Sequence, residues 1–215
     1  IGITTSEIAV GSRCPYVRPL VGAVSTQAST DPRLGPFALR LLETGYSPAR
    51  AIHELEASDP HIERRQLGVV DKYGSPAART GSLNSPWAGH IAKPNYVAMG
   101  NGLVGEQVVT AMASAFEDSE SEALEERLLR AIEAGQEAGG ERSRATSPHH
   151  SAALIVYDSH SFSRVDLRVD EHPDPVVELR RVFESYRPEI GFYTLRPSEP
   201  TAAKVDRDRR WEGPR

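Results

Sequence analysis

IGITTSEIAVGSRCPYVRPLVGAVSTQ, residues 1–27, holds the pattern that decides the fold. Two short runs of β-branched and small residues, 1–5 and 20–26, each end in side chains that carry hydroxyl groups. Runs of this kind, bounded by glycine and proline, predict β-strands. Hydroxyl groups at strand ends, with a cation such as Arg18 in the connection, suit the floor of a binding or catalytic site. They equally suit a plain buried sheet edge.

The composition is that of one globular domain that can bury a substantial core. The chain has 215 residues, of which 39% are hydrophobic and 26% charged, and its formal net charge is −5. Binding to nucleic acid or to an anionic membrane would call for a basic face, so neither partner is expected. No run approaches the ~20 apolar residues that cross a bilayer. The single cysteine excludes an intrachain disulfide framework and fits a reducing compartment, so we expect a cytoplasmic protein.

Periodicity and turn residues predict strands, then helices, then strands again, which is the order of a mixed α+β fold with helices covering sheets. A single domain is predicted over residues 1–187. The C-terminal extension, 188–215, ends in a charged stretch, 204–215, that is expected to be disordered. The intervening predicted elements are strands at 66–71, 75–81, 96–99, 151–157 and 164–169 and helices at 37–44, 48–57, 105–116, 121–138 and 176–186.

Several motifs follow one another in the order found in a known family. They are VGAVSTQ (21–27), TDPRLGP (30–36), RQLGVVD (65–71), WAGH (87–90), GNGL (100–103), the stretch 135–140, SAAL (151–154), DLRVD (166–170) and HPDP (172–175). With these motifs the sequence resembles, over residues 1–186, a bacterial and archaeal family of unknown function (domain of unknown function ten twenty-eight). That family is assigned to the Ntn-hydrolase superfamily.

The resemblance implies a four-layer αββα sandwich and a hydrolase in which an N-terminal Thr, Ser or Cys attacks an amide carbonyl, with its own α-amino group as the base. Ile1 has no nucleophilic side chain, and residues 1–5 look like the family's second strand, so the sandwich is expected to lack its first strand. We expect either that residues precede Ile1 in the natural polypeptide or that the chain was processed. A missing strand would expose a sheet edge, from which we expect a homo-oligomer.

Three residues are predicted to support catalysis in this fold. The Ser6 hydroxyl could orient a nucleophile or a bound carbonyl, or it could simply bond to the backbone at a strand end. Arg18 follows a strand where superfamily enzymes often place a cation that lowers the pKa of the nucleophile, and the alternative is a surface arginine. Asn101, between two glycines, could donate to an oxyanion, or it could be a turn residue before a helix.

Four further residues are predicted to bind substrate. Thr26 and Gln27 end a strand where they could form an oxyanion site, and a turn-forming pair is the alternative. Trp87 and His90 lie in the irregular stretch 84–101, which is predicted to form a pocket lid. His90 could instead be a loop histidine bonded to the backbone. Cys14 is interpreted as a small buried hydrophobic residue, although neighbouring arginines could lower its pKa.

No cofactor and no metal are predicted. His149 and His150 lack a third ligand at metal spacing, and there is no Walker loop, dinucleotide fingerprint or serine nucleophile elbow. The sequence therefore predicts a hydrolase that acts on a C–N amide-type bond of a small molecule. The alternative is a non-catalytic module on the same fold that binds a small ligand or mediates oligomerisation.

Overall fold

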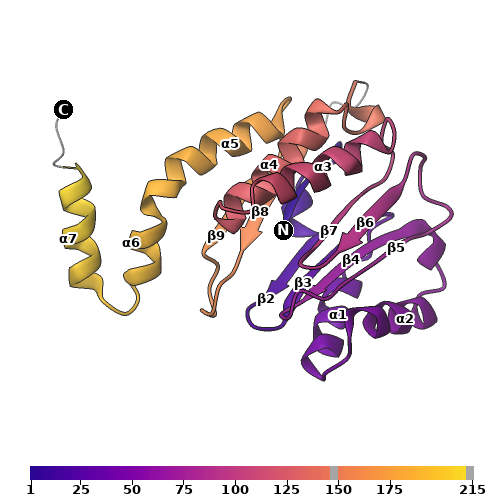
Figure 1. Cartoon of the computed structure of the whole chain (residues 1–215), viewed down its shortest axis with the longest axis horizontal. Helices are drawn as coiled ribbons and strands as arrows, with labels where there is room; N and C mark the ends of the chain where they lie inside the picture. Colours follow the sequence, from indigo (N-terminus) through magenta and orange to yellow (C-terminus); the bar gives the residue numbers. More distant parts are fainter. Residues whose placement is uncertain (146–149, 212–215) are drawn as a thin grey trace.

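The computed structural model describes residues 1–145 and 150–211, which form a mixed α+β fold of antiparallel sheets flanked by helices (Figure 1). In chain order the strands are β1 (Gly2–Thr5), β2 (Pro15–Arg18), β3 (Gly22–Ala28), β4 (Arg65–Asp71), β5 (Pro76–Thr80), β6 (Gly89–Lys93), β7 (Tyr96–Gly100), β8 (Ser151–Val156) and β9 (Val165–Val169). The helices are α1 (Leu34–Glu43), α2 (Pro48–Ser58), α3 (Gln107–Asp118), α4 (Leu124–Glu137), α5 (Pro175–Tyr186), α6 (Ile190–Leu195) and α7 (Pro200–Trp211).

The strands form three separate antiparallel groups. A four-stranded sheet has the order β2–β3–β4–β5, a three-stranded sheet has the order β1–β8–β9, and β6 pairs with β7. The β1–β8 pairing joins the start of the chain to its later half, with Gly2 opposite Leu154 and Thr5 opposite Ser151. Because antiparallel strands present alternate side chains to opposite faces, each sheet has one face for a helical layer and one face for the interior.

Helices α1 and α2 cover one face of the four-stranded sheet. The sequence begins α2 clearly, because the Ser47 hydroxyl accepts a bond of 3.3 Å from the Arg50 N–H and Pro48 occupies the first turn. The apolar side of the two helices packs on one face of β3 and β4, through Leu39, Ala51, Leu55, Val24, Leu67 and Val69. The residues that alternate with Val24 on β3 therefore face away from these helices.

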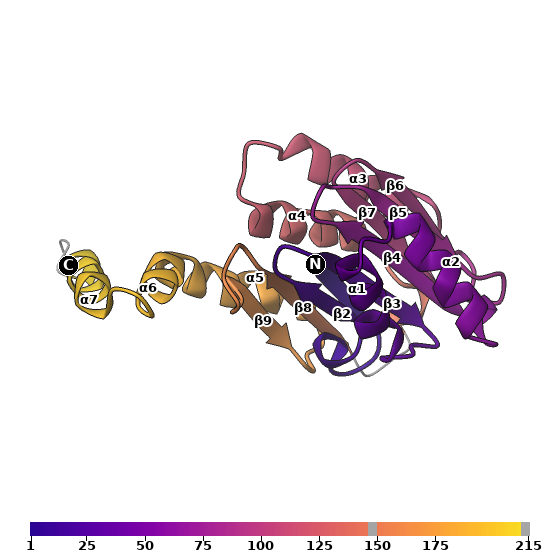
Figure 2. The same ribbon diagram turned by 90° about the horizontal axis from the view of Figure 1, so that it is seen from below.

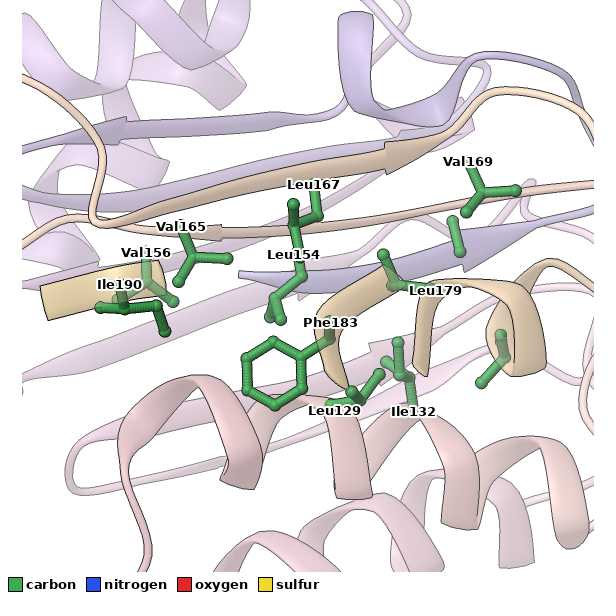
Figure 3. Packing of buried hydrophobic residues seen from close by; sticks show 12 residues of the cluster. Leu129, Ile132, Leu154, Val156, Val165, Leu167, Val169, Leu179, Phe183 and Ile190 are labelled. Atoms are coloured by element: carbon green, nitrogen blue, oxygen red, sulfur yellow. The ribbon is translucent and has the colours of Figure 1, made fainter. Parts of the chain in front are cut away.

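Helices α4 and α5 pack against β8 and β9 around a second core (Figure 3). Phe183 of α5 is fully buried in this core, beside Leu129 of α4 and Leu154 of β8. Ion pairs join the two helices at the edge of the core. Arg180 of α5 donates to two carboxylates of α4, Glu126 at 2.7 Å and Glu133 at 2.7 Å. Burial of this aromatic ring contributes on the order of 2–3 kcal/mol relative to its exposure.

The predicted strands and helices through residue 186 are all present, and the structure adds two strands that the sequence did not predict. The stretch 84–101 is not an irregular lid, because β6 and β7 form a hairpin within it. Most β6 residues are exposed, so their sequence carries no alternation of apolar and polar residues. Strand β2 is four residues long and begins at Pro15, which weakens its strand signal.

The C-terminal extension leads away from the rest of the molecule (Figures 1 and 2). Residues 204–211, where the sequence predicts disorder, are helical in α7, and residues 212–215 lie outside the described residues. Helix α7 packs on α6, where Ala203 is fully buried and Arg207 pairs with Glu189 at 3.2 Å. Across residues 1–145 and 150–211, no helix combines the length and the apolar character that a membrane span requires.

Candidate functional site

A cavity of about 800 Å³ lies where strand ends from three different pairings meet. Ser6 follows β1, Gln27 lies in β3 and Asn101 follows β7, and all three line this cavity. We call it the polar cavity, and its other polar lining residues include Arg13, Thr30, Arg64, Asn84, Glu141, Arg142 and Ser143. The structure thus brings together three of the residues that the sequence predicted to serve one site.

Asn101 is held in place by a fully buried glutamine. Its Nδ2 donates to Gln66 Oε1 at 3.2 Å, and Gln66 Nε2 donates in turn to the carbonyl oxygens of Gly100 at 2.8 Å and Gly89 at 3.1 Å. Gln66 has no solvent exposure. Because a carboxamide carries two donor hydrogens, Asn101 retains one hydrogen and its Oδ1 for a molecule in the polar cavity.

Glu141 brings a carboxylate to the end of β1. The Ser6 backbone N–H donates to Glu141 Oε2 at 3.0 Å. Ser143 Oγ donates to Ser6 Oγ at 2.9 Å and lies 3.5 Å from Glu141 Oε2. The Ser6 hydroxyl is therefore part of a small Ser–Ser–Glu group at the wall of the polar cavity.

Cys14 is buried, as the sequence predicts, and lies at the wall of the polar cavity. Its Sγ is 3.6 Å from Thr30 Oγ1. Burial raises the pKa of the Cys14 thiol, and the lowering effects of the Thr30 bond and of Arg13 are smaller. The thiol is therefore protonated at neutral pH, which is the unreactive form.

Arg18 lies in a different cavity. It pairs with Glu43 at the end of α1 and lines an apolar groove of about 500 Å³ on the other side of Gln27. We call this cavity the apolar groove. It is lined by one face of β3, by β7, by α3 and α4, and by the start of β1. Gln27 lines both the apolar groove and the polar cavity, whereas Arg18 lines only the groove.

The remaining predicted residues do not line the polar cavity. Thr26 is fully buried on the face of β3 opposite Gln27. Trp87 packs beside the core formed by β7, α3 and α4, and its backbone pairs with Leu103 in both directions. His90 Nδ1 lies 2.9 Å from Thr80 Oγ1, which accepts a bond of 3.0 Å from Gln66. His90 is thus linked to Asn101 through Thr80 and Gln66.

Two residues that position the site were not predicted. Gln66 is a polar side chain at the start of the apolar run of β4, and a polar residue in a buried strand is a signal that it bonds to other buried groups. Nothing in the sequence around Glu141 indicates that it belongs to the site, because it meets Ser6 only when distant segments come together. The Leu103–Glu141 bridge is part of that tertiary arrangement. The described residues contain no group of three or more His, Cys, Asp or Glu that could hold a metal ion. His149, one of the histidines considered for a metal, lies outside the described residues.

The protein is thus an antiparallel α+β protein in which residues at strand ends form a polar cavity rich in hydroxyl and amide groups. The family of unknown function DUF1028 matches residues 1–179, and the chain belongs to this family. The structure is similar to the crystal structure of protein SPO2555 from Silicibacter pomeroyi, a DUF1028 protein, with a TM-score of 0.76 and 29% sequence identity. The similarity covers 86% of this chain and 83% of that chain. No curated protein matches the sequence.

Proposed function

We propose that the polar cavity binds a small molecule through an amide or a related carbonyl group. The observation that carries this proposal is the convergence of Ser6, Gln27 and Asn101 on one cavity from three strand ends. A carboxamide can donate to a carbonyl oxygen and accept from an amide N–H at the same time, which matches both ends of an amide group. Because Gln66 fixes Asn101, these donors and acceptors are positioned before a ligand arrives.

We further propose that the reaction this cavity serves is hydrolysis of a C–N amide bond on an Ntn-type αββα fold. In such a reaction the N-terminal nucleophile would add to the carbonyl carbon, and the C–N bond would break as the amine leaves with the proton of the nucleophile. Water would then release the acyl group from the nucleophile as a carboxylic acid. Asn101 Nδ2 would stabilise the oxyanion of the tetrahedral intermediate, and Ser6 would orient the carbonyl. Arg18 lies in the apolar groove, so its role would be charge at a distance and not contact with the substrate.

The described lining residues of the polar cavity favour binding over nucleophilic attack. An Ntn-type reaction uses an N-terminal Thr, Ser or Cys as its nucleophile. Cys14 is held as a thiol by burial, and no histidine lines the polar cavity in the part of the chain that the structure describes. Hydrolysis is therefore a separate prediction, with its own test. Cytoplasmic location and homo-oligomerisation also stay predictions.

Binding is tested by titrating the ¹⁵N-labelled protein with N-acetylglycinamide, a small molecule with two amide groups. We expect saturable shifts of the side-chain amide signals of Asn101 and Gln27. Replacing Asn101 by Leu should remove the binding, whereas the same change at the exposed Gln107 should leave it unaltered. Shifts that are absent, or that survive Asn101→Leu in a folded protein, would refute the proposed site.

Hydrolysis is tested on the natural full-length polypeptide with an electrophilic probe for N-terminal nucleophiles. An adduct on the N-terminal residue, located by mass spectrometry, is the result expected of an amide hydrolase. Absence of an adduct, with N-acetylglycinamide still bound, would leave the non-catalytic binding module as the function.

A further inference from the structure

Arginine side chains give the polar cavity an excess of positive charge. Its described lining residues include three arginines, Arg13, Arg64 and Arg142, and two acidic residues, Glu7 and Glu141. Because a guanidinium group stays charged in proteins, the described lining carries a formal excess of one positive charge. This excess contrasts with the whole chain, whose formal net charge is −5.

Two of these arginines have no side-chain partner among the described residues. The guanidinium groups of Arg64 and Arg142 form no ion pair and no hydrogen bond there, whereas Arg13 donates to a backbone carbonyl at 2.7 Å. The adjacent Arg65, by contrast, pairs with a buried aspartate at 2.8 Å. Glu141, a carboxylate of the same cavity, accepts from a backbone N–H at 3.0 Å and not from either guanidinium group. Within the described part of the chain, the N–H donors of Arg64 and Arg142 are therefore open to a bound anion.

The same two arginines lie beside the two carboxamide residues of the proposed site. The Arg142 backbone N–H donates at 2.8 Å to the carbonyl of the residue that follows Asn101. The Ser29 N–H, two residues after Gln27, donates to the Arg64 carbonyl at 3.2 Å. A ligand whose amide group bonds to Asn101 or Gln27 would therefore hold the neighbouring part of its structure near a guanidinium group.

We propose that the polar cavity selects amides that carry a carboxylate close to the amide group, as N-acyl amino acids do. This inference rests on the proposed function, because it names the class of amide that the same cavity binds. The N–H donors of a guanidinium group form a planar fork that matches the two oxygens of a carboxylate. A formal excess of one positive charge matches a singly charged carboxylate, whereas a phosphate monoester carries about −1.5 to −2.

The test compares N-acetylglycine with N-acetylglycinamide by calorimetric titration of the natural full-length polypeptide. The two ligands share one amide group and nearly the same shape, and only N-acetylglycine carries a carboxylate. An exposed ion pair strengthens binding by about threefold, so the two arginines predict about tenfold tighter binding of N-acetylglycine. Equal affinities would overturn the inference and leave the proposed amide site intact, whereas binding of neither ligand would refute the proposed function as well.

Variants of the two arginines locate the carboxylate. Arg64→Gln and Arg142→Gln each remove one guanidinium group, and Arg40→Gln at an exposed position of α1 is the matched control. Each cavity variant should reduce the preference for N-acetylglycine from about tenfold to about threefold, and the double variant should abolish it. Because the preference is a ratio of two affinities of one variant, a general weakening of the site cancels from it. A preference that survives in the double variant, or that falls equally in Arg40→Gln, would overturn the inference.

Two further measurements separate a carboxylate site from general attraction of anions. N-acetylaminomethylphosphonate, which replaces the carboxylate by a phosphonate, should bind more weakly than N-acetylglycine, and equal or tighter binding would overturn the inference. In ¹⁵N spectra, N-acetylglycine should shift the Nε–Hε signals of Arg64 and Arg142 and leave that of Arg40 unchanged. Shifts confined to arginines outside the polar cavity would also overturn it.

Discussion

Replacing Gln66 by Leu removes the centre of the hydrogen-bond chain that positions the site. Gln66 serves the carbonyl oxygens of Gly100 and Gly89, the Thr80 hydroxyl and the Asn101 amide, at distances between 2.8 and 3.2 Å. Leucine has a similar size but no polar atoms. The substitution therefore leaves the buried Gly100 carbonyl and the half-buried Gly89 carbonyl without this donor, and it leaves Asn101 free to turn.

The cost follows from these lost bonds. A buried polar group left without its partner costs about 1–3 kcal/mol, so the two carbonyls and Asn101 together predict destabilisation of about 3 kcal/mol. Urea denaturation measures this loss as a lower midpoint. The control is Gln107→Leu at the exposed start of α3, which should change stability by less than about 0.5 kcal/mol.

The same variant links stability to function. Because Asn101 is no longer held, folded Gln66→Leu should bind N-acetylglycinamide more weakly than the Gln107→Leu control. A free energy of unfolding within about 1 kcal/mol of that of the control would refute the claim that the hydrogen bonds of Gln66 stabilise the fold. Unaltered ligand binding would refute the claim that Gln66 positions Asn101.

Two further perturbations test the charged groups. Arg180→Met should lower the free energy of unfolding by about 2–4 kcal/mol, because it leaves the buried Glu126 carboxylate with less compensating charge. Arg181→Met, which removes an exposed ion pair, should lower it by less than about 0.5 kcal/mol. Equal losses of stability in urea denaturation would contradict this expectation. The Arg33 guanidinium lowers the pKa of Asp31 from 3.8 to about 2, so this carboxylate stabilises the fold above pH 3.8 and the stabilisation is lost as pH falls toward 2. Between about pH 6 and about pH 3 the stability advantage of the wild type over Asp31→Asn should shrink by about 1 kcal/mol. If the free energies of unfolding of the two proteins fall in parallel over this pH range, the lowered pKa of Asp31 is contradicted.

Local signals in the sequence predicted most of the elements, because their physical causes are local. Ser47 and Pro48 predicted the start of α2, since a capping hydroxyl and a proline in the first turn act within one turn of the helix. The alternation of apolar and polar residues in 164–169 similarly predicted a strand, which is β9. Strand β6 was missed because its exposed residues need no apolar pattern, and its strand form depends on pairing with β7.

The candidate site was predicted in part. Ser6, Gln27 and Asn101 follow or end strands, and polar groups at strand ends converge where the strands end together. Arg18 was placed in the same site, but the docking of α1 brings Glu43 to it and leaves it in the apolar groove. Glu141 was missed because 135 residues separate it from Ser6, and only tertiary structure brings the two together.

A crystal structure of the protein soaked with N-acetylglycinamide tests the central claim most directly. The account predicts density for the amide in the polar cavity, with a carbonyl oxygen at hydrogen-bond distance from Asn101 Nδ2 and contacts to Gln27 and Ser6. Water alone in the polar cavity, or the amide bound only elsewhere, would contradict it.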